Sequence, residues 1–488
     1  MATICKPGNN CRLSLRDRYC CDSACKTVSG KRSIQLAGAP PVTLLTSVSP
    51  TFVSSATTPR PAGGEQLKAP HRVLVSLYRK CGPGVISGAA NDDPSCIVTY
   101  SMAGAAFGYL TLWTSLFTFP LLAAVQLMCS RLGLITRRGL AKDVRLKYPR
   151  WVVFSICGML VVANTITIGA DLGGMAEVTQ LVTGIPSYIW NPTYTVAIVA
   201  LLFCFPFRIL QDVFKWLCLV LLVYIISGFL ARPDWNAALF HTLIPSFQGS
   251  RHYLSVLVAI VGATMSPYFL FWQVSQEVEN EYCRRRRIVN IPDAPSPKRL
   301  ERSKADVLTG SFISKLITYF ITLTTAATLF THGKTDIATA REAASALSPV
   351  AGPAASWLFA IGIIGTGLLA VPTLAGSSAY AVSEAFRWRA SLEAKVAIAP
   401  KFYAVLAISA FIGMALVHSG LHAMQMLFWA SVCNGLLAPP SIALVILLSR
   451  NPKVMGDHVN KSWMNWCGWI IFSLTAAAAV AMLVSFIR

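Results

Sequence analysis

Two adjacent acids and a proline interrupt an apolar stretch of the chain. Asp92, Asp93 and Pro94 lie within the segment from Gly84 to Tyr100. Proline breaks a helix, and an ionised carboxylate at membrane depth costs at least ~2.5 kcal/mol, so such a pair calls for a partner. The partner we expect is a cation. The alternative is that both acids lie at a helix end near the membrane interface, where water hydrates them.

A second interruption lies far downstream. Gly262 to Tyr268, which includes Ser266 and Pro267, falls near the middle of an apolar stretch from Tyr253 to Glu277. Interrupted apolar segments at matching positions in two halves of a chain are typical of inverted repeats that hold their substrate at the membrane midplane. We therefore expect helices 1–5 and 6–10 to be two inverted repeats, with helices 1 and 6 broken.

The two breaks together offer oxygen ligands. A half-helix that ends inside the membrane leaves unpaired carbonyls with partial negative charge, and the carboxylates add full charges. An oxygen shell suits a hard ion such as Mg²⁺ or Mn²⁺ and offers less to a soft one. The expected ligands are the carboxylates of Asp93 and Asp92, the carbonyls near Ala90 and Ala263, and the hydroxyls of Ser95, Thr264 and Ser266.

Polar residues inside other predicted helices are weaker candidates. Asn164 and Asp171 are seven residues apart in helix 3, so they share a face and predict a hydrated path for the ion. Glu177 extends that path or lies near the outer interface. Asn434 in helix 10 reaches the ion or bridges helices by hydrogen bonds.

The amino-acid composition indicates that these elements lie in a membrane. Of 488 residues, 54% are hydrophobic and 13% are charged, which predicts an all-α polytopic membrane protein. We expect about eleven transmembrane helices. They run from Gly84 to Tyr100, Tyr109 to Cys129, Trp151 to Thr183, Trp190 to Phe207, Val213 to Leu230, Tyr253 to Glu277, Val307 to Thr331, Trp357 to Phe386, Phe402 to Val417, Met424 to Ser449, and Trp466 to Ile487.

The net charge of +21 gathers in alternate loops, such as Arg131 to Arg150 and Arg284 to Lys304, rather than on a soluble domain. This pattern follows the positive-inside rule. It places the N-terminus in the cytoplasm and, with an odd helix count, the C-terminus outside. It argues against nucleic acid as a partner, and we expect only the ion and the lipid bilayer.

The chain divides into a tail and a transporter domain. Residues 1–72 are basic and rich in Cys, Ser, Thr and Pro, so we expect a disordered cytoplasmic tail. Residues 80–488 form the transmembrane domain. Within it we expect repeat one over about 82–232, repeat two over about 250–450, and an extra helix over about 463–487.

At both breaks the sequence resembles the Nramp family of divalent metal transporters. The resemblance rests on Gly82-Pro83-Gly84, on Asp93-Pro94, on Gly104 to Tyr109, and on Gly262-Ala263-Thr264 followed by Pro267. It covers roughly residues 80–488. It implies a LeuT-like fold, alternating access, and uptake of divalent ions across the plasma (inner) membrane.

Four positions depart from the family pattern, and one of them, Ser95, stands where the family has a glycine. Ser266 stands where the family has a metal-binding methionine, and Tyr268 stands where it has a histidine tied to proton transport. With these residues, the segment from Ser266 to Gln273 resembles that of the Nramp-related magnesium transporter branch. The resemblance implies a larger site that holds a partly hydrated ion, and transport that is not coupled to protons. Tyr268 and Gln273 then join the predicted ion pathway. Cys96 occupies the family's asparagine position, where it lines the cavity or restores affinity for softer ions.

The sequence thus predicts a passive or potential-driven Mg²⁺ importer that also passes Mn²⁺. The first alternative is a proton-coupled Mn²⁺/Fe²⁺ importer in which Asp171 and Glu177 carry the proton. A second is an amino-acid or organic-cation carrier on the same fold, although the acid pair would repel a carboxylate. We expect a monomer that needs no cofactor besides the transported ion, and no enzyme, because H-E-x-x-H and G-x-S-x-G motifs are lacking.

Overall fold

The computed structural model describes residues 91–205, 222–287, 296–337, 339–345, 355–417 and 422–487. All of them belong to one compact unit, Lys68–Arg488. Within these ranges the regular elements are helices. They are α3 (Pro94–Phe107), η2 (Gly108–Thr111), α4 (Trp113–Thr136), α5 (Leu140–Lys147), α6 (Arg150–Thr183), α7 (Ser187–Cys204), α9 (Leu222–Leu230), α10 (Trp235–Leu243), α11 (Arg251–Thr264), α12 (Pro267–Arg287), α13 (Pro297–Thr328), η3 (Phe330–His332), α14 (Ala340–Ser345), α16 (Ala355–Ala385), α17 (Pro400–Leu416), α18 (Ala423–Ser449), α19 (Pro452–Met455), η6 (Gly456–His458) and α20 (Ser462–Ile487).

Eight helices in the described ranges are long and apolar enough to cross a membrane, counting α11 and α12 as one span. Three further predicted spans correspond to α3, α9 and the 17-residue α17. The chain order of these helices matches the prediction. The first part of helix 1, the first part of helix 5 and the N-terminal tail lie outside the described residues.

Several helix ends differ from the predicted ones. Helix 1 continues beyond Tyr100 to Phe107, and Gly108 then turns the chain with a φ of +57° that favours glycine. Helix 2 consequently begins at Trp113 rather than Tyr109. Helix 7 begins at Pro297, ten residues before the predicted Val307, because its first turns are polar and a hydropathy window misses them.

Both predicted breaks are present. Asp93 is the N-cap of α3, with an extended backbone (φ −73°, ψ 171°), so the second half of helix 1 begins directly after the acid pair. In helix 6, α11 ends at Thr264, Met265 leaves the helical conformation (φ −121°, ψ 51°), and α12 begins at Pro267. Each proline occupies the first position of a helix, where its missing N–H costs nothing.

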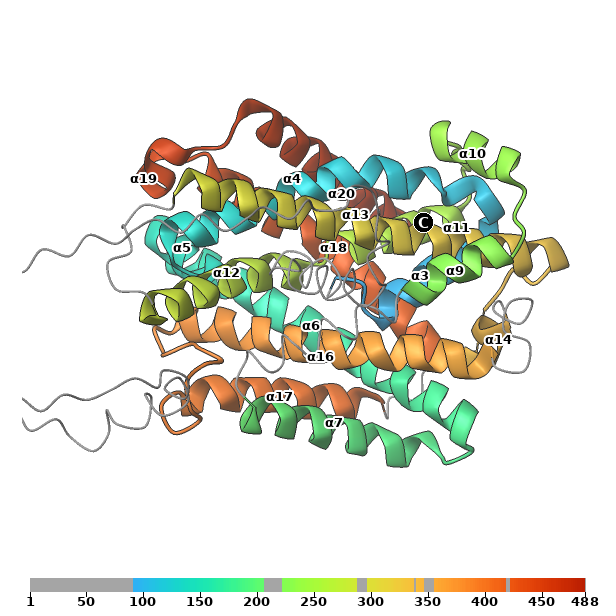
Figure 1. Cartoon of the computed structure of the whole chain (residues 1–488), viewed down its shortest axis with the longest axis horizontal. Coiled ribbons are helices and arrows are strands. Elements are labelled where there is room, and N and C mark those ends of the chain that lie inside the picture. Colours follow the sequence, from blue (N-terminus) through green and yellow to red (C-terminus); the bar gives the residue numbers. More distant parts are fainter. Residues whose placement is uncertain are drawn as a thin grey trace, which may run out of the picture. The chain divides into compact units, whose positions relative to one another are not determined.

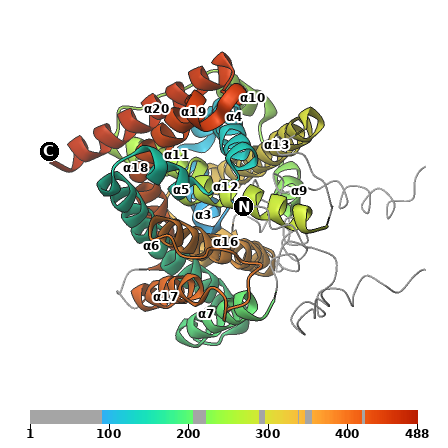
Figure 2. The ribbon, with the colours of Figure 1, turned by 90° about the vertical axis from the view of Figure 1, so that its left-hand side faces the viewer.

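The second half of helix 1 lies in the middle of the helical packing (Figure 1). It contacts α11, α13, α18, α16 and α6. α7 and α17 pack together at one edge, and α20 packs on α4 and α18 at another (Figure 2). Helices α11 and α18 approach closely at Gly262, where a Cβ atom would lie 1.9 Å from the carbonyl oxygen of Ser431. The break in helix 1 is therefore enclosed by elements from both halves of the chain.

Candidate ion site at the broken helices

Asp93 is fully buried and bound by donors from both broken helices. Its Oδ1 accepts hydrogen bonds from the backbone N–H of Cys96, at 2.8 Å, and from the Ser95 hydroxyl. Its Oδ2 accepts from the Tyr268 hydroxyl of α12 at 3.3 Å. The N-terminus of α3 adds the positive end of its dipole, so the carboxylate is held where the two breaks meet.

Asp92 is equally buried and faces helix 7. Ser314 Oγ donates to its Oδ1 at 2.8 Å, and its Oδ2 has no partner among the described residues. The next residue, Lys315, places an ammonium group whose charge acts on Asp92. Asp92 is only 1% exposed, so the protein itself, rather than bulk water, surrounds both acids in this conformation.

Lys315 is a buried cation that the sequence reasoning missed. Its Nζ donates to Thr264 Oγ1 at 2.9 Å and to the Tyr100 hydroxyl at 3.1 Å, and these two oxygens lie 2.8 Å apart. The sequence contained a signal for it, because a lone lysine inside the predicted span from Val307 needs a partner just as the two acids do. The predicted ligand Thr264 is thus already bound to an ammonium group.

The carbonyl of Ala263 ends the first half of helix 6 and points toward helix 1. It accepts hydrogen bonds from the Cys96 thiol at 3.2 Å and from Asn91 Nδ2 at 3.4 Å. The Asn91 carbonyl lies 3.1 Å from the same sulfur, so the two carbonyls share its single proton. The thiol therefore serves as a hydrogen-bond donor between the breaks, and an ion at Ala263 would replace one of these donors. The matching carbonyl of Ala90 lies outside the described residues.

Two predicted residues of helix 6 line the same region. Ser266 donates to the Gly262 carbonyl at 2.9 Å, which satisfies one backbone acceptor left by the break. Gln273, seven residues after Ser266, is fully buried, and neither of its amide atoms has a partner among the described residues.

Helix 3 contributes one acid near the break. Asp171 is fully buried, no side chain of the described residues donates a hydrogen bond to its carboxylate, and the backbone N–H of Ser95 and the charge of Asp93 both act on it. Asn164 lies seven residues before Asp171 on the same helix. It donates to the Leu374 carbonyl at 3.1 Å and to Ser377 and Ser378 at 2.8 Å each. Asp171 thus lies next to the site, whereas Asn164 joins helix 3 to helix 8.

Two other predicted residues make structural contacts. Asn434 Nδ2 donates to Thr167 Oγ1 at 3.2 Å, which bridges helices 10 and 3, while its Oδ1 lacks a partner. Glu177 accepts from the backbone N–H of Ala340 at 3.0 Å, close to the end of α6, so it belongs to the connection before α14. Glu177 therefore binds the N-terminus of α14, and its place in the ion pathway stays a prediction.

The donor set suits a hydrated ion. Among the described residues, no three His, Cys, Asp or Glu side chains are grouped to hold a metal by themselves. Among the described residues, buried oxygens without partners remain on Asn91 and Asp92. Such orphaned acceptors are satisfied by water or by a cation with its water, because burial without any partner costs about 1–3 kcal/mol for each group.

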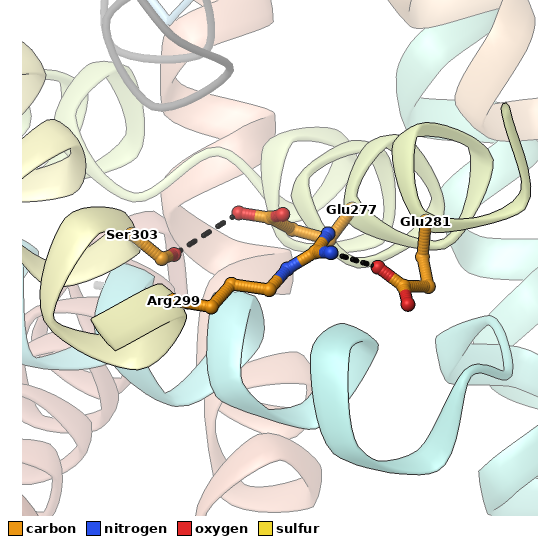
Figure 3. Close-up of polar contacts among 4 residues, drawn as sticks. All are labelled: Glu277, Glu281, Arg299 and Ser303. Carbon is orange, nitrogen blue, oxygen red and sulfur yellow. Dashed lines mark hydrogen bonds and ion pairs between the residues drawn. The ribbon is translucent and has the colours of Figure 1, made fainter. Parts of the chain in front are cut away.

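A second polar network lies further along α12, from its middle onward (Figure 3). Glu277 accepts a hydrogen bond from Ser303 of α13 at 3.3 Å. It accepts another from Ser130 of α4 at 2.8 Å. One turn further on, Glu281 forms an ion pair with Arg299 of α13. The second half of helix 6 is therefore tied to Asp93 at its start and to helices 2 and 7 from its middle onward.

The family model for natural resistance-associated macrophage protein-like sequences, Nramp, matches residues 84–485. The chain belongs to the Nramp family. A relative from Verminephrobacter eiseniae, named divalent metal cation transporter MntH, is 27% identical over 439 residues, which are 85% of this chain and 90% of the relative. The predicted family and the multi-pass membrane transporter class are thereby confirmed, and the relatives are transporters rather than enzymes.

Solved structures agree on the fold of this Nramp protein. The manganese transporter of Eremococcus coleocola superposes with a TM-score of 0.67 at 21% identity, covering 86% of this chain and 89% of that one. MHP1, a nucleobase-cation-symport-1 family transporter, gives a TM-score of 0.51 at 13% identity, covering 84% and 94%. The predicted LeuT-like fold with broken helices 1 and 6 is confirmed.

Proposed function

We propose that this Nramp protein carries a divalent metal cation across the membrane by alternating access, and that the ion is Mg²⁺, with Mn²⁺ as a second substrate. The class is supported by the relative named as a divalent metal cation transporter and by the fold shared with a manganese transporter. It is also supported by an acid pair buried between two broken helices. The proposed ligands are Asp93, Asp92 and the carbonyl and hydroxyl groups around the breaks.

The observation that carries the choice of Mg²⁺ is the chemistry of the atoms around Asp93. Ser266 and Tyr268 present hydroxyl oxygens, and Tyr268 bonds directly to the carboxylate. The thiol of Cys96 is directed to the carbonyls of Asn91 and Ala263. Oxygen donors together with unpartnered amide and carboxylate oxygens favour a hard ion that keeps part of its water.

We propose that transport needs no proton. A phenol, rather than an imidazole, contacts Asp93, and imidazole is the side chain that ordinarily titrates near neutral pH. An inside-negative potential would drive a divalent ion inward with about 2.3 kcal/mol per charge per 100 mV. The proposal includes a monomer in the plasma or inner membrane with a cytoplasmic N-terminus and an external C-terminus.

A proton-coupled Mn²⁺/Fe²⁺ importer is the second candidate. It is favoured by Asp171, a buried carboxylate beside Asp93 to which no described side chain donates a hydrogen bond, because such a group is suited to carry a proton. Glu177 bonds to Ala340 instead and is less suited to that role. An amino-acid carrier is disfavoured, since Asp92 and Asp93 would repel a substrate carboxylate.

Uptake by the purified protein in proteoliposomes tests the proposal. With an inside-negative potential set by valinomycin, we expect Mg²⁺ entry without acidification of the lumen, and Mn²⁺ entry in competition with it. Asp93→Asn should abolish entry, whereas Asp457→Asn, at an exposed acid on η6, should retain it. Acidification that follows metal entry would instead support the proton-coupled candidate, and Mn²⁺ entry without Mg²⁺ entry would overturn the choice of ion.

A further inference from the structure

A basic cavity of about 200 Å³ lies apart from the ion site, where α4, α13 and α20 meet. It is located near the end of α4 and the beginnings of α13 and α20. Its wall contains three cationic side chains and one acid, a net formal charge of +2, over an apolar floor that includes Leu127 and Met464. The charged residues are Arg131, Lys304, Lys461 and Glu301.

The cationic groups leave donors for an anion. Arg131 donates from one terminal nitrogen to the carbonyls of His458 and Val459, at 2.8 and 3.3 Å, which fixes its side chain, while its Nε has no partner among the described residues. Lys304 and Lys461 are exposed at the rim. A phosphate group could therefore accept bonds from a positioned guanidinium and two mobile ammonium groups.

The surroundings favour a lipid as the carrier of that phosphate. The cavity lies between three membrane-spanning helices. Of an apolar 18-residue stretch of α20, only 28% is buried inside the protein. Trp463, 44% exposed, lies at the cavity wall and supplies an aromatic ring of the type enriched at membrane interfaces. Basic pockets between transmembrane helices bind the headgroups of anionic lipids.

We propose that this cavity binds the phosphate-bearing headgroup of an anionic phospholipid. The headgroup contacts Arg131, Lys304 and Lys461, and the start of its acyl region covers the apolar floor. On the orientation proposed above, which this step rests on, the lipid belongs to the cytoplasmic leaflet.

The cavity also adjoins the network that anchors helix 6. Ser130 and Ser303 line it, and both hydroxyls contact Glu277 of α12. Figure 3 shows the contact of Ser303. Ser130 and Ser303 also bond to each other across α4 and α13. A bound headgroup thus joins α4, α13 and α20 one side chain away from the second half of helix 6, so lipid binding and transport should be linked.

Lipid binding to the purified full-length protein tests the site directly. Native mass spectrometry would compare phosphatidylglycerol with phosphatidylcholine for the wild type and for the double variant Lys304→Gln/Lys461→Gln. Each basic residue contributes about five-fold in affinity, so the double variant should bind phosphatidylglycerol roughly 25-fold more weakly. The matched control is Lys147→Gln/Lys453→Gln, at two exposed lysines outside the cavity, which should bind as the wild type does.

A second measurement separates the two sources of phosphate. Phosphatidylglycerol should raise the thermal unfolding midpoint of the wild type by several degrees more than that of the double variant, and inorganic phosphate alone should not. If inorganic phosphate reproduces the shift in the wild type only, the cavity takes a soluble anion and the lipid is wrong. Equal lipid affinity and equal shifts in both proteins would overturn the site altogether.

The outcome is separable from the proposed function. Calorimetric Mg²⁺ binding should be the same in the wild type and the double variant, because no cavity residue belongs to the ion site. Selective lipid binding without Mg²⁺ transport in any variant would contradict the proposed ion and leave the lipid site intact. If phosphatidylglycerol stimulates transport by the double variant as much as transport by the wild type, the link to helix 6 is contradicted.

Discussion

At the scale of single residues, Lys315 sets the charge of the ion site. Its ammonium offsets one of the two neighbouring carboxylates through its effect on Asp92, and it binds Thr264 and Tyr100. Replacing Lys315 by Met removes this charge and keeps the length of the side chain. We expect divalent ions to bind roughly tenfold more tightly, worth about 1.4 kcal/mol, and turnover to fall because release becomes slower.

Calorimetric binding and proteoliposome flux, measured on the same preparation, would check both effects of Lys315→Met. Lys315→Arg keeps the charge and should retain wild-type affinity. Unchanged affinity in Lys315→Met would mean that the ammonium does not influence the bound ion.

Ser266 determines whether a sulfur ligand is present at the break in helix 6. Ser266→Met exchanges a hydroxyl bonded to Gly262 for a soft thioether. We expect the ratio of Mn²⁺ to Mg²⁺ uptake to rise by about tenfold, because sulfur favours the softer ion. Ser266→Ala removes the hydroxyl without adding sulfur, so uptake competition between the two ions should give it a ratio near that of the wild type. A ratio that rises equally in both variants would trace selectivity to the lost hydroxyl.

At the scale of helices, the sequence predicted the breaks because proline and charge are local signals. Asp93-Pro94 and Ser266-Pro267 lie at the starts of α3 and α12 as expected. The contacts across the site could not be predicted in the same way. That Cys96 binds the Ala263 carbonyl, or that Asn164 binds helix 8 rather than the ion, depends on how distant helices pack. Ser314 and Lys315 were accessible in principle, since their polarity interrupts an apolar span.

The crossing of α11 and α18 depends on a missing side chain. A Cβ atom at Gly262 would lie 1.9 Å from the Ser431 carbonyl oxygen and 2.4 Å from the Gly435 nitrogen, so neither neighbour is a side chain that can move aside. We expect Gly262→Ala to lower stability by about 1–3 kcal/mol, seen as a lower thermal unfolding midpoint in detergent. Gly158→Ala is the matched control, because nothing lies within 4 Å of a Cβ there. Equal midpoints for the two variants would contradict the close crossing.

The short helix α5 carries a buried acid outside the membrane spans. Burial raises the pKa of Asp143 from 3.8 to about 6, although a hydrogen bond from Thr136 and the charges of Arg138 and Lys142 oppose the rise. The folded state therefore binds this proton more tightly than the unfolded state does. The stability that this tighter proton binding contributes is lost as pH rises from about 4 to about 6. At neutral pH, burial of the charged carboxylate lowers the free energy of unfolding by at most about 3 kcal/mol.

We expect Asp143→Asn to unfold at a higher temperature than the wild type at neutral pH and to match it near pH 4. Thermal unfolding in detergent across this range would show the difference closing as pH falls. The control Asp457→Asn, at an exposed acid, should follow the wild type at every pH. A difference between Asp143→Asn and the wild type that does not vary with pH would contradict the raised pKa.

At the scale of the whole molecule, helix 6 connects the ion site to a polar network with α4 and α13. Its second half bonds to Asp93 through Tyr268 and to α4 and α13 through Glu277 and Glu281. Movement of α12 therefore alters the site and the distant network together. Alternating access requires such a connection, because the path from the ion site to one side of the membrane must close when the path to the other side opens.

The coupling of this movement to other ions can be tested by the voltage at which net flux stops. For an uncoupled divalent ion, a tenfold Mg²⁺ gradient is balanced by about 30 mV, since two charges cross the membrane. Symport with one proton moves three charges, so the same gradient would be balanced by about 20 mV, and one unit of pH gradient would shift the balance by about 20 mV more. With Tyr268 rather than an imidazole on Asp93, we expect the 30 mV value and no shift with pH in proteoliposomes clamped by valinomycin. If Asp171 carries a proton, the shift appears in the wild type and Asp171→Asn removes it.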